Sequence, residues 1–473
     1  MPNETGKIAY IVSHGFAARM LLQTGLLGKL RALGREVCVI PPDDSDPVLR
    51  EYCDRHGIGL HPFSSGKWIW KTNYGLYRSY FLENLQSNAA LYEKHYYEVH
   101  LRHGGLIFRI IPRFLMVLQS VFTRLRVLQK AFIAMESLLL RDVRATKLLK
   151  EIQAGMVVST YPVNHREGIL LHNARKGKIP TAIHLLSWDN ISCKGRFYAL
   201  ADRYIAWGPV MVEEFIAHYR IPEKHIAACG VPHFDLHHQM QNDPERLDLI
   251  RKTGMDPSKP YLIFGMSSPR FAPKEIDVVE SIASGITSGI WGPDIQMLVR
   301  PHPQNVLGWM ADPEWIKRLE KLEGPRIRIF YPLLAKSHLP WSMELEDMRL
   351  LSAALSGCLV CINSCSTLSI DALMSGKGNI APMFDGKEQL PYWQSARRLL
   401  DYTHIRKFVA SGGTEVAVNY EDLQHKISSF LEEPEKHYAA ARAARQRACG
   451  SSLGDATNRV AQALDEWVKE HIE

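Results

Sequence analysis

Short apolar segments alternate with helical patterns along most of this chain, and this alternation restricts the possible folds more than any other feature. An apolar segment at residues 7–12 precedes a helical pattern at 18–33 and a second apolar segment at 36–40. Further apolar segments lie at 156–160, 181–186, 203–207 and 226–230, and a second series lies at 261–264, 296–300, 359–362 and 379–382. Alternating strands and helices predict parallel sheets covered by helices. Two series predict two sheets.

The chain has 473 residues, enough for two α/β domains of ordinary size. The polar segment 239–260 separates the two series of strands. We therefore predict two Rossmann-like domains that face a cleft, at residues 1–240 and 241–450, although the dinucleotide fingerprint G-x-G-x-x-G is missing from the first βαβ segment. Residues 451–473 should form a helix that packs back on the body, since four apolar residues share one face: Val460, Leu464, Trp467 and Val468.

Residues 64–150 interrupt the first series with a helical insertion whose net positive charge exceeds that of the whole chain. The insertion has fourteen basic and five acidic residues, whereas the whole chain has a net charge of only +7. Basic residues interleaved with aromatic residues and an apolar stripe are typical of helices on an anionic membrane surface. Alternatively, the stripe belongs to the core and the arginines form a solvated face. Nucleic acid is not an expected partner, because no recognisable binding module accompanies the charge.

The N-terminus lacks a secretory signal, and no run of 18 apolar residues occurs, so we expect a cytoplasmic protein. Any membrane association would be peripheral, on the inner face of the cytoplasmic membrane. Cys358, Cys361 and Cys365 have the spacing C-x2-C-x3-C, but strand geometry would point the first two to opposite faces. We interpret these cysteines as apolar fillers and predict no metal site.

In the N-terminal half, the strand at 181–186 ends in Trp188, Asp189 and Asn190, with Lys194 close behind. Ligands of open α/β sheets bind at the carboxyl ends of strands, so we expect these residues on the acceptor side, with Asp189 as a general base. An Asx turn is the structural alternative. His14, at the end of the first strand, is the rival base, although a histidine in a turn is often structural.

Three loops in the C-terminal half have the character of an anion site. Arg300 and His302 lie in a stiff Arg-Pro-His-Pro loop, where both could contact a phosphate; a structural turn is the alternative. The segment 363–367 offers hydroxyl groups at a helix N-terminus, which also suit helix capping. Glycine in the loop 265–268 permits close approach to a nucleotide. The predicted residues of these last two loops are Ser364, Ser366, Thr367, Gly265 and Ser267.

Together these motifs resemble the GT-B glycosyltransferase superfamily, and within it the bacterial surface-polymer enzymes related to CDP-glycerol glycerophosphotransferases. The Trp-His-Gly motif of that family corresponds here to Trp188-Asp189-Asn190, and its Gly-x-Pro-x-x-Asp motif to residues 230–235. The His-Pro motif corresponds to His302-Pro303, and Thr-Asp-Tyr-Ser-Ser corresponds to residues 363–367. Similar His-Pro and Ser-Ser pairs occur in bacterial sialyl- and Kdo-type transferases, where they hold the phosphate and cytosine of a CMP-sugar.

The departures from the family favour a sugar donor over glycerol phosphate, because Asp189 replaces the family's histidine base and Ser364 replaces its aspartate. The resemblance implies a metal-independent glycosyltransferase that needs no cofactor beyond a nucleotide-activated sugar as co-substrate. Its acceptor would be a bacterial cell-surface glycan or a lipid-linked molecule. Two enzymatic alternatives are a CDP-glycerol-type polyol-phosphate transferase and a sugar-nucleotide 2-epimerase. A third is a non-catalytic scaffold that docks on a membrane assembly.

Overall fold

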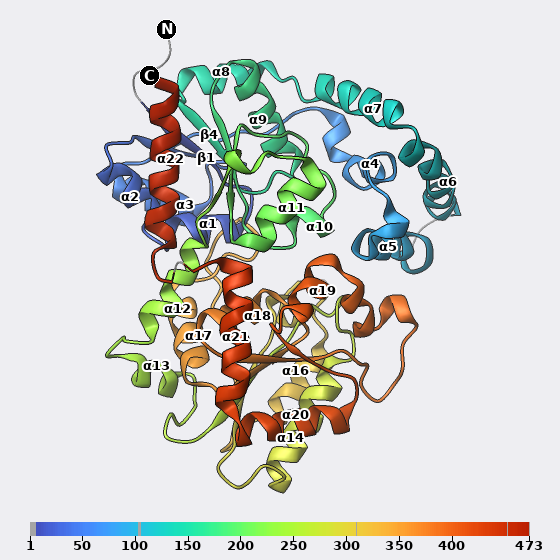
Figure 1. Ribbon diagram of the computed structural model, residues 1–473, viewed down its shortest axis with the longest axis vertical. Coiled ribbons are helices and arrows are strands. Elements are labelled where there is room, and N and C mark those ends of the chain that lie inside the picture. The colour runs from blue at the N-terminus through green and yellow to red at the C-terminus, as the bar shows by residue number, and fades with distance from the viewer. Residues whose placement is uncertain (1–5, 103–105, 309, 452, 473) are drawn as a thin grey trace. The chain divides into compact units, whose positions relative to one another are not determined.

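A computed structural model describes residues 6–102, 106–308, 310–451 and 453–472 (Figure 1). The chain forms two compact units. Unit 1 comprises the residues up to 233, the segment 336–342 and the residues from 455 on; unit 2 comprises 234–335 and 343–454. The predicted boundary at residue 240 lies at the end of α12 (Asp235–Met240), which packs within unit 2.

Unit 1 contains a parallel seven-stranded sheet in the order β3-β2-β1-β4-β5-β6-β7. Its strands are β1 (Ile8–Ile11), β2 (Val37–Ile40), β3 (Gly59–Leu60), β4 (Met156–Ser159), β5 (Thr181–His184), β6 (Arg203–Ala206) and β7 (Ile226–Ala228). The helices outside the insertion are α1 (Gly15–Leu22), α2 (Leu26–Ala32), α3 (Pro47–His56), α9 (His165–Lys176), α10 (Asn190–Cys193), α11 (Pro209–Tyr219) and α22 (Ala456–Ile472). The helical pattern at 18–33 is thus two helices, because Gly25 adopts a positive φ of 74° between them.

The helix α22 lies beside α2, and its apolar face enters the core of unit 1 (Figure 1). The residues predicted to form that face, Val460, Leu464, Trp467 and Val468, are all buried there with Leu26, Leu27 and Leu30. The C-terminal helix therefore packs on the core of unit 1. Burial of four such side chains contributes several kcal/mol, at roughly 1.5–3 kcal/mol each.

The predicted insertion in unit 1 is helical and lies between β3 and β4. It contains two short 3-10 helices, Trp68–Lys71 and Leu85–Ser87, and one π-helical turn, Tyr97–Leu101. Its α-helices are α4 (Tyr74–Leu82), α5 (Ala89–Tyr96), α6 (Leu106–Arg124), α7 (Arg126–Leu139) and α8 (Val143–Glu151). In the part of the chain that the structure describes, no helix is both long enough and apolar enough to span a membrane.

Unit 2 contains a parallel six-stranded sheet in the order β10-β9-β8-β11-β12-β13. Its strands are β8 (Tyr261–Gly265), β9 (Gln296–Arg300), β10 (Ile327–Ile329), β11 (Val360–Asn363), β12 (Gly378–Pro382) and β13 (Glu415–Ala417). Its helices, besides α12, are α13 (Arg246–Lys252), α14 (Glu275–Ser288), α15 (Pro303–Val306), α16 (Pro313–Glu320), α17 (Leu345–Gly357), α18 (Thr367–Met374), α19 (Thr403–Ala410), α20 (Tyr420–Glu432) and α21 (Pro434–Cys449).

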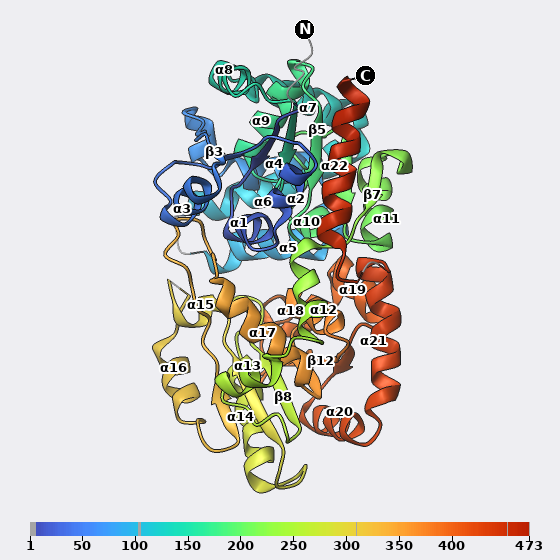
Figure 2. The same ribbon diagram turned by 90° about the vertical axis from the view of Figure 1, so that its left-hand side faces the viewer.

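Helices cover both faces of the unit 2 sheet (Figure 2). Successive side chains along a strand enter the two hydrophobic cores in turn, one on each face. Leu262 and Phe264 of β8 pack with α14, α16 and α20, whereas Tyr261 and Ile263 pack with α12, α13 and α17. This period of two is the side-chain alternation of a strand. The prediction of two Rossmann-like parallel sheets is therefore confirmed.

The segment 336–342 corrects the predicted domain division, which placed it in the C-terminal domain. Leu339 is buried in the core of unit 1, and Asp46 fixes the flanking backbone. The Asp46 carboxylate accepts hydrogen bonds from the Ser337 hydroxyl at 2.6 Å, from His338 N–H at 2.7 Å and from Leu339 N–H at 3.3 Å. Asp46 also caps α3, accepting from Leu49 N–H at 2.9 Å. These contacts join positions almost 300 residues apart, which no local pattern reveals.

Candidate functional site

In each sheet, the strand order reverses direction between two neighbouring strands, β1 and β4 in unit 1 and β8 and β11 in unit 2. Open α/β sheets bind ligands at the carboxyl ends of strands beside such a switch point. The predicted residues of the C-terminal half lie in the loops that leave β8, β9 and β11, except Gly265 and Arg300, which end β8 and β9. We call residues 265–268, 301–303 and 363–367 the unit 2 loop cluster.

Glu275, the first residue of α14, ties two of these loops together. Its carboxylate accepts hydrogen bonds from Ser267 N–H and from the Ser364 hydroxyl, both at 2.6 Å. The side chain is buried, and this burial outweighs both hydrogen bonds and raises the pKa of Glu275 to about 7. Ser364 and Ser267 are thus held in place by a carboxyl group that titrates near neutral pH.

Asn305 joins the β8 loop to the β9 loop. Its amide donates to Ser267 C=O at 3.1 Å, and its amide oxygen accepts from His302 N–H at 2.6 Å. His302 caps α15, since its Nδ1 accepts from Gln304 N–H at 3.1 Å. Burial and the nearby Arg300 cation lower the pKa of His302 to about 4. The ring is therefore neutral at pH 7, with its proton on Nε2 as the donor.

The third loop forms the N-terminus of α18. Ser366 is the N-cap, and its hydroxyl accepts from Leu368 N–H at 3.3 Å. The Asn363 side chain orders the turn by accepting from Ser366 N–H at 2.9 Å and from the Ser369 hydroxyl at 2.7 Å. Thr367 is the first residue of the helix. The N-terminus of α18 thus presents backbone N–H groups and hydroxyls at the switch point, an arrangement that suits an anion.

Gly265 and Arg300 have structural partners in unit 2. A Cβ at Gly265 would lie 1.9 Å from Leu368 Cδ2, so the missing side chain allows the first turn of α18 to approach the end of β8. The Arg300 guanidinium forms a buried ion pair with Asp347 at 2.6 Å and lies over the ring of Phe330 at 4.4 Å. Arg300 thereby anchors the end of β9 to α17.

In unit 1, the fold brings together predicted residues that are far apart in the sequence. Asp189 and Lys194 form an ion pair at 3.0 Å, and the Asp189 carboxylate raises the pKa of Lys194. Burial, followed by the Lys194 and Arg19 cations, lowers the pKa of His14 to about 4. The ring of His14 lies beside that of Tyr161, with centroids 6.1 Å apart. We call His14, Tyr161, Asp189 and Lys194 the unit 1 cluster.

The orientation of His14 bears on its chemistry. Its Nδ1 accepts a hydrogen bond from Phe16 N–H at 3.2 Å and caps α1. The neutral ring consequently carries its proton on Nε2, which makes that nitrogen a donor. Beside the cluster, Trp188 is half-buried and Asn190 is buried, and the amide of Asn190 donates to Asp189 Oδ1 at 3.4 Å.

The insertion holds the backbone that carries Lys194. Asn88 of the insertion donates to Ser192 C=O at 2.7 Å, and Lys94 donates to Cys193 C=O at 2.8 Å. Arg78 donates to Arg196 C=O at 2.6 Å. Three side chains of the insertion therefore fix residues 192–196, next to the predicted base.

Sequence reasoning missed Glu275, Asn305 and Tyr161. Acidic residues are common in the first turn of a helix, and an Asn in a short loop is common too, so the first two positions give no distinct signal. Tyr161 is the second residue after β4, at the switch point of unit 1. The rule used for the other loops could therefore have found it.

One hollow of unit 1 lies apart from the predicted site residues, and no metal cluster is found within the described ranges. Within the described ranges, no group of three or more His, Cys, Asp or Glu side chains is arranged to hold a metal ion. All eight cysteines are buried free thiols. A hollow of about 620 Å³ lies between α7, α9 and residues 196–202, and none of its lining residues is a predicted site residue.

The sequence matches no protein-family model, and no curated protein matches it. Solved structures of similar fold include the UDP-GlcNAc 2-epimerase from Neisseria meningitidis bound to UDP-GlcNAc, with 11% identity and a TM-score of 0.57 over 97% of this chain and 100% of that one. The S. aureus MnaA–UDP structure has 10% identity and a TM-score of 0.56 over 98% and 97%. A glycosyltransferase from Rickettsia africae has 12% identity and a TM-score of 0.51 over 99% of each chain.

At this level of identity the likeness concerns the fold alone. It shows that the chain has the GT-B type of fold, with two Rossmann-like units, as the sequence motifs imply. The relation to CDP-glycerol glycerophosphotransferases stays a prediction.

Proposed function

We propose that this protein is a glycosyltransferase that moves a sugar from a nucleotide-activated donor to a cell-surface glycan or a lipid-linked acceptor. The observation that carries the proposal is the unit 2 loop cluster. Glu275 and Asn305 join the loops after β8, β9 and β11 into one hydrogen-bonded frame at the switch point of the sheet. Unit 2 would accordingly bind the donor.

The donor's phosphates would lie between His302 and the N-terminus of α18. His302 offers Nε2–H as a neutral donor, while Ser366 and Thr367 supply hydroxyls beside the first N–H groups of the helix. Departure of the nucleotide places negative charge on a phosphate oxygen. Fixed donors aimed at this charge stabilise the transition state more than the ground state.

The acceptor would bind unit 1, with Asp189 as the general base. A base must have a lone pair available for the acceptor's proton, and the hydrogen bond at His14 Nδ1 leaves Nε2 protonated. His14 therefore suits a role as a donor that orients the acceptor, and Asp189 is the better base. Lys194 pairs with the Asp189 carboxylate and, in this proposal, counters the charge of an anionic acceptor.

The test begins with purified protein and a panel of UDP-, GDP- and CMP-sugars and CDP-glycerol. A bound donor should raise the unfolding temperature, and slow donor hydrolysis should follow. Asp189→Asn should still bind the donor but lose about 10²–10⁴-fold in turnover. His302→Ala should lose about 10²–10³-fold. Asp54→Asn and His425→Ala, at exposed positions, are the matched controls. Unchanged turnover in both site variants would contradict the assignment.

A sugar-nucleotide 2-epimerase is the second candidate, and the structural likeness to the UDP-GlcNAc 2-epimerase from Neisseria meningitidis favours it. The loop cluster would then hold the same type of nucleotide, while the unit 1 cluster would act on the sugar. The two functions differ in their products. An epimerase incubated with UDP-GlcNAc alone gives the 2-epimer, which NMR resolves, whereas a glycosyltransferase requires an acceptor for rapid release of the nucleotide.

A further inference from the structure

Helix α6 exposes one apolar stripe, whereas other apolar residues of the helix, Leu115 and Met116, pack against the insertion. Ile110, Phe114, Val117 and Val121 follow the spacing of one helical face, and 49%, 61%, 70% and 44% of these residues' surfaces are exposed. The apolar stripe of an ordinary surface helix faces the core. The opposite face of α6 is buried or half-buried, and Gln119 on that face donates to Glu83 C=O at 2.8 Å.

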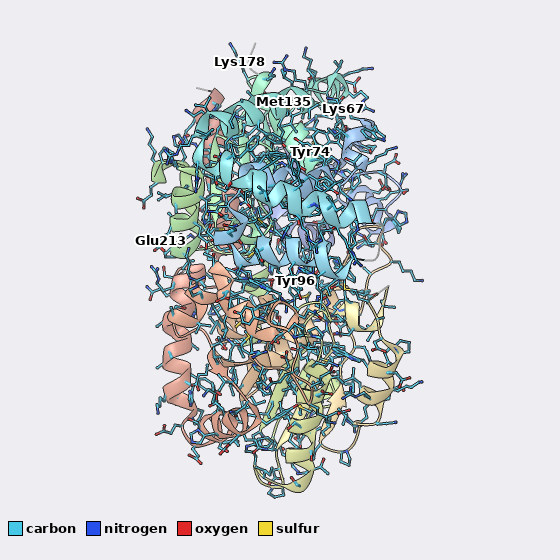
Figure 3. All side chains as sticks on the ribbon, turned by 90° about the vertical axis from the view of Figure 1, so that its right-hand side faces the viewer. Lys67, Tyr74, Tyr96, Met135, Lys178 and Glu213 are labelled. Atoms are coloured by element: carbon cyan, nitrogen blue, oxygen red, sulfur yellow. The ribbon has the colours of Figure 1, made fainter. Side chains whose placement is uncertain are left out.

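Helix α7 also exposes apolar residues. Val127, Met135 and Leu138 are 77%, 51% and 55% exposed, and Leu125, between the two helices, is 52% exposed. Figure 3 views the insertion from the side on which α6 and α7 lie in front, with Met135 labelled. Trp68 adds an exposed indole ring near the end of α7, because Lys67 donates to Leu139 C=O at 2.5 Å. The apolar face of the insertion is our name for the exposed apolar residues of both helices, of the residue between them and of the first 3-10 helix: Ile110, Phe114, Val117, Val121, Leu125, Val127, Met135, Leu138 and Trp68.

Positive charge borders the apolar face. The sequence of α6 and α7 contains five basic residues and one acidic residue, Glu136. Glu136 is buried and forms a two-pronged pair with Arg78, so its charge is already neutralised. With about 100° per residue, Arg113 and Arg124 both lie about 80–100° to the same side of Phe114. The described surface of these helices therefore combines exposed apolar residues with a basic flank.

The inner side of the same helices is packed firmly against the rest of the insertion. Phe81 of α4 contacts Phe122 of α6 and Phe132 of α7, with ring centroids 4.8 and 5.0 Å apart. Helices α4 and α5 in turn contribute Arg78 and Lys94, which hold the backbone of residues 193–196. The apolar face is thus connected through one layer of helices to the unit 1 cluster.

We propose that α6 and α7 lie in the interfacial layer of an anionic lipid bilayer. The apolar face would enter the boundary of the acyl chains, and Arg109, Arg113, Arg124, Arg126 and Lys130 would contact lipid phosphates. A bilayer suits this surface better than a second copy of the chain, since anionic lipid headgroups neutralise the basic flank, whereas an antiparallel contact between two copies would bring their basic flanks together. The consequence for the acceptor rests on the proposed function: residues 189–196 would be held at a fixed distance from the bilayer, which selects a lipid-linked acceptor.

Vesicle co-sedimentation of the full-length protein tests the proposal. The protein should bind vesicles of phosphatidylcholine mixed with phosphatidylglycerol, and binding should weaken with added salt and with phosphatidylcholine alone. The triple variant Phe114→Ser, Val117→Ser, Val121→Ser should abolish binding. Arg113→Gln with Arg124→Gln should lower the partition coefficient about 25-fold, at about fivefold per charge near the surface. All these side chains are exposed, so the variants should keep the wild-type unfolding temperature.

The matched controls are Ile290→Ser and Lys321→Gln, which change one exposed apolar and one exposed basic side chain of unit 2 and should leave binding intact. Equal binding of wild type and both α6 variants would overturn the proposal. So would a dimer in solution that the triple variant dissociates, without any binding to vesicles. Donor hydrolysis in detergent-free buffer reports on the catalytic proposal separately, because the α6 variants do not alter either candidate site.

Discussion

Glu275 accepts a hydrogen bond from the Ser364 hydroxyl at 2.6 Å, although 89 residues separate them in the sequence. The same carboxyl group binds Ser267 N–H, so one buried side chain sets the distance between the loops after β8 and β11. A frame of this kind holds the donors of an anion site in place before the ligand arrives. Because the pKa of Glu275 is raised to about 7, the pH dependence of stability tests the role of this frame.

Replacing Glu275 with Gln should change how the stability of unit 2 depends on pH. The folded-state pKa of about 7 lies above the unfolded value of about 4.3, so the folded state binds the extra proton between these values. The wild-type unfolding free energy should therefore fall as pH rises from about 4.5 to 7, and Glu275→Gln should flatten this dependence. Chemical denaturation at several pH values measures it; an unchanged slope would contradict the raised pKa.

The contact between Gly265 and Leu368 predicts a steric conflict on substitution. Gly265→Ala should destabilise unit 2 by about 1–3 kcal/mol, because the added methyl group meets Leu368 Cδ2. It should also weaken nucleotide binding by displacing the first turn of α18. The double variant with Leu368→Ala provides the control, since removing the opposing side chain should reduce the destabilisation caused by Gly265→Ala. Purely additive losses in the double-mutant cycle would exclude a direct conflict.

The Asp46 carboxylate should fix the segment 336–342 on unit 1. Asp46→Ala removes a helix cap and leaves three donors without their acceptor, which should cost about 2–4 kcal/mol. Hydrogen exchange at His338 N–H should speed up accordingly. Ser337→Ala, which removes a single donor, should cost about 1 kcal/mol. Unchanged exchange at His338 would show that other contacts hold this segment.

Asp46 should also contribute to acid sensitivity. Burial opposes its ionisation, but the hydrogen bonds from Ser337, Leu49, His338 and Leu339 prevail and lower the pKa of Asp46. Its stabilising effect is therefore present above the ordinary pKa of about 3.9 and is lost as pH falls through the folded-state value. The difference in stability between wild type and Asp46→Asn should shrink below about pH 4, as measured by hydrogen exchange at low pH.

The buried Arg78–Glu136 pair should be needed for the insertion to hold residues 192–196. Glu136→Gln removes the counter-charge of Arg78, which is buried with about 4% of its surface exposed. This loss should cost about 3–5 kcal/mol of stability. The double variant Arg78→Met, Glu136→Leu should recover much of that stability. It should still lose turnover, because Met cannot donate to Arg196 C=O. Full activity of the double variant would show that this anchor is dispensable.

The sequence alone determined the two parallel sheets, their core strands and the docking of the C-terminal helix. Those features follow from local periodicity, because a strand buried on both faces is a short apolar run and a docked helix repeats its apolar residues every three or four positions. It missed β3, β10 and β13, which are short and lie at or next to the sheet edges, where partial exposure removes the apolar signal.

Only the tertiary structure decided how the candidate sites are built. It placed His14 beside Tyr161, where the Lys194 cation lowers the pKa of His14. It also paired Arg300 with Asp347 in an ion pair and Ser364 with Glu275 in a hydrogen bond. It also turned the apolar stripe of α6 outward, although the same spacing suits a core helix. Periodicity shows that a face is apolar, but only packing shows what it contacts. The chemistry of a buried polar group likewise depends on partners that are distant in the sequence.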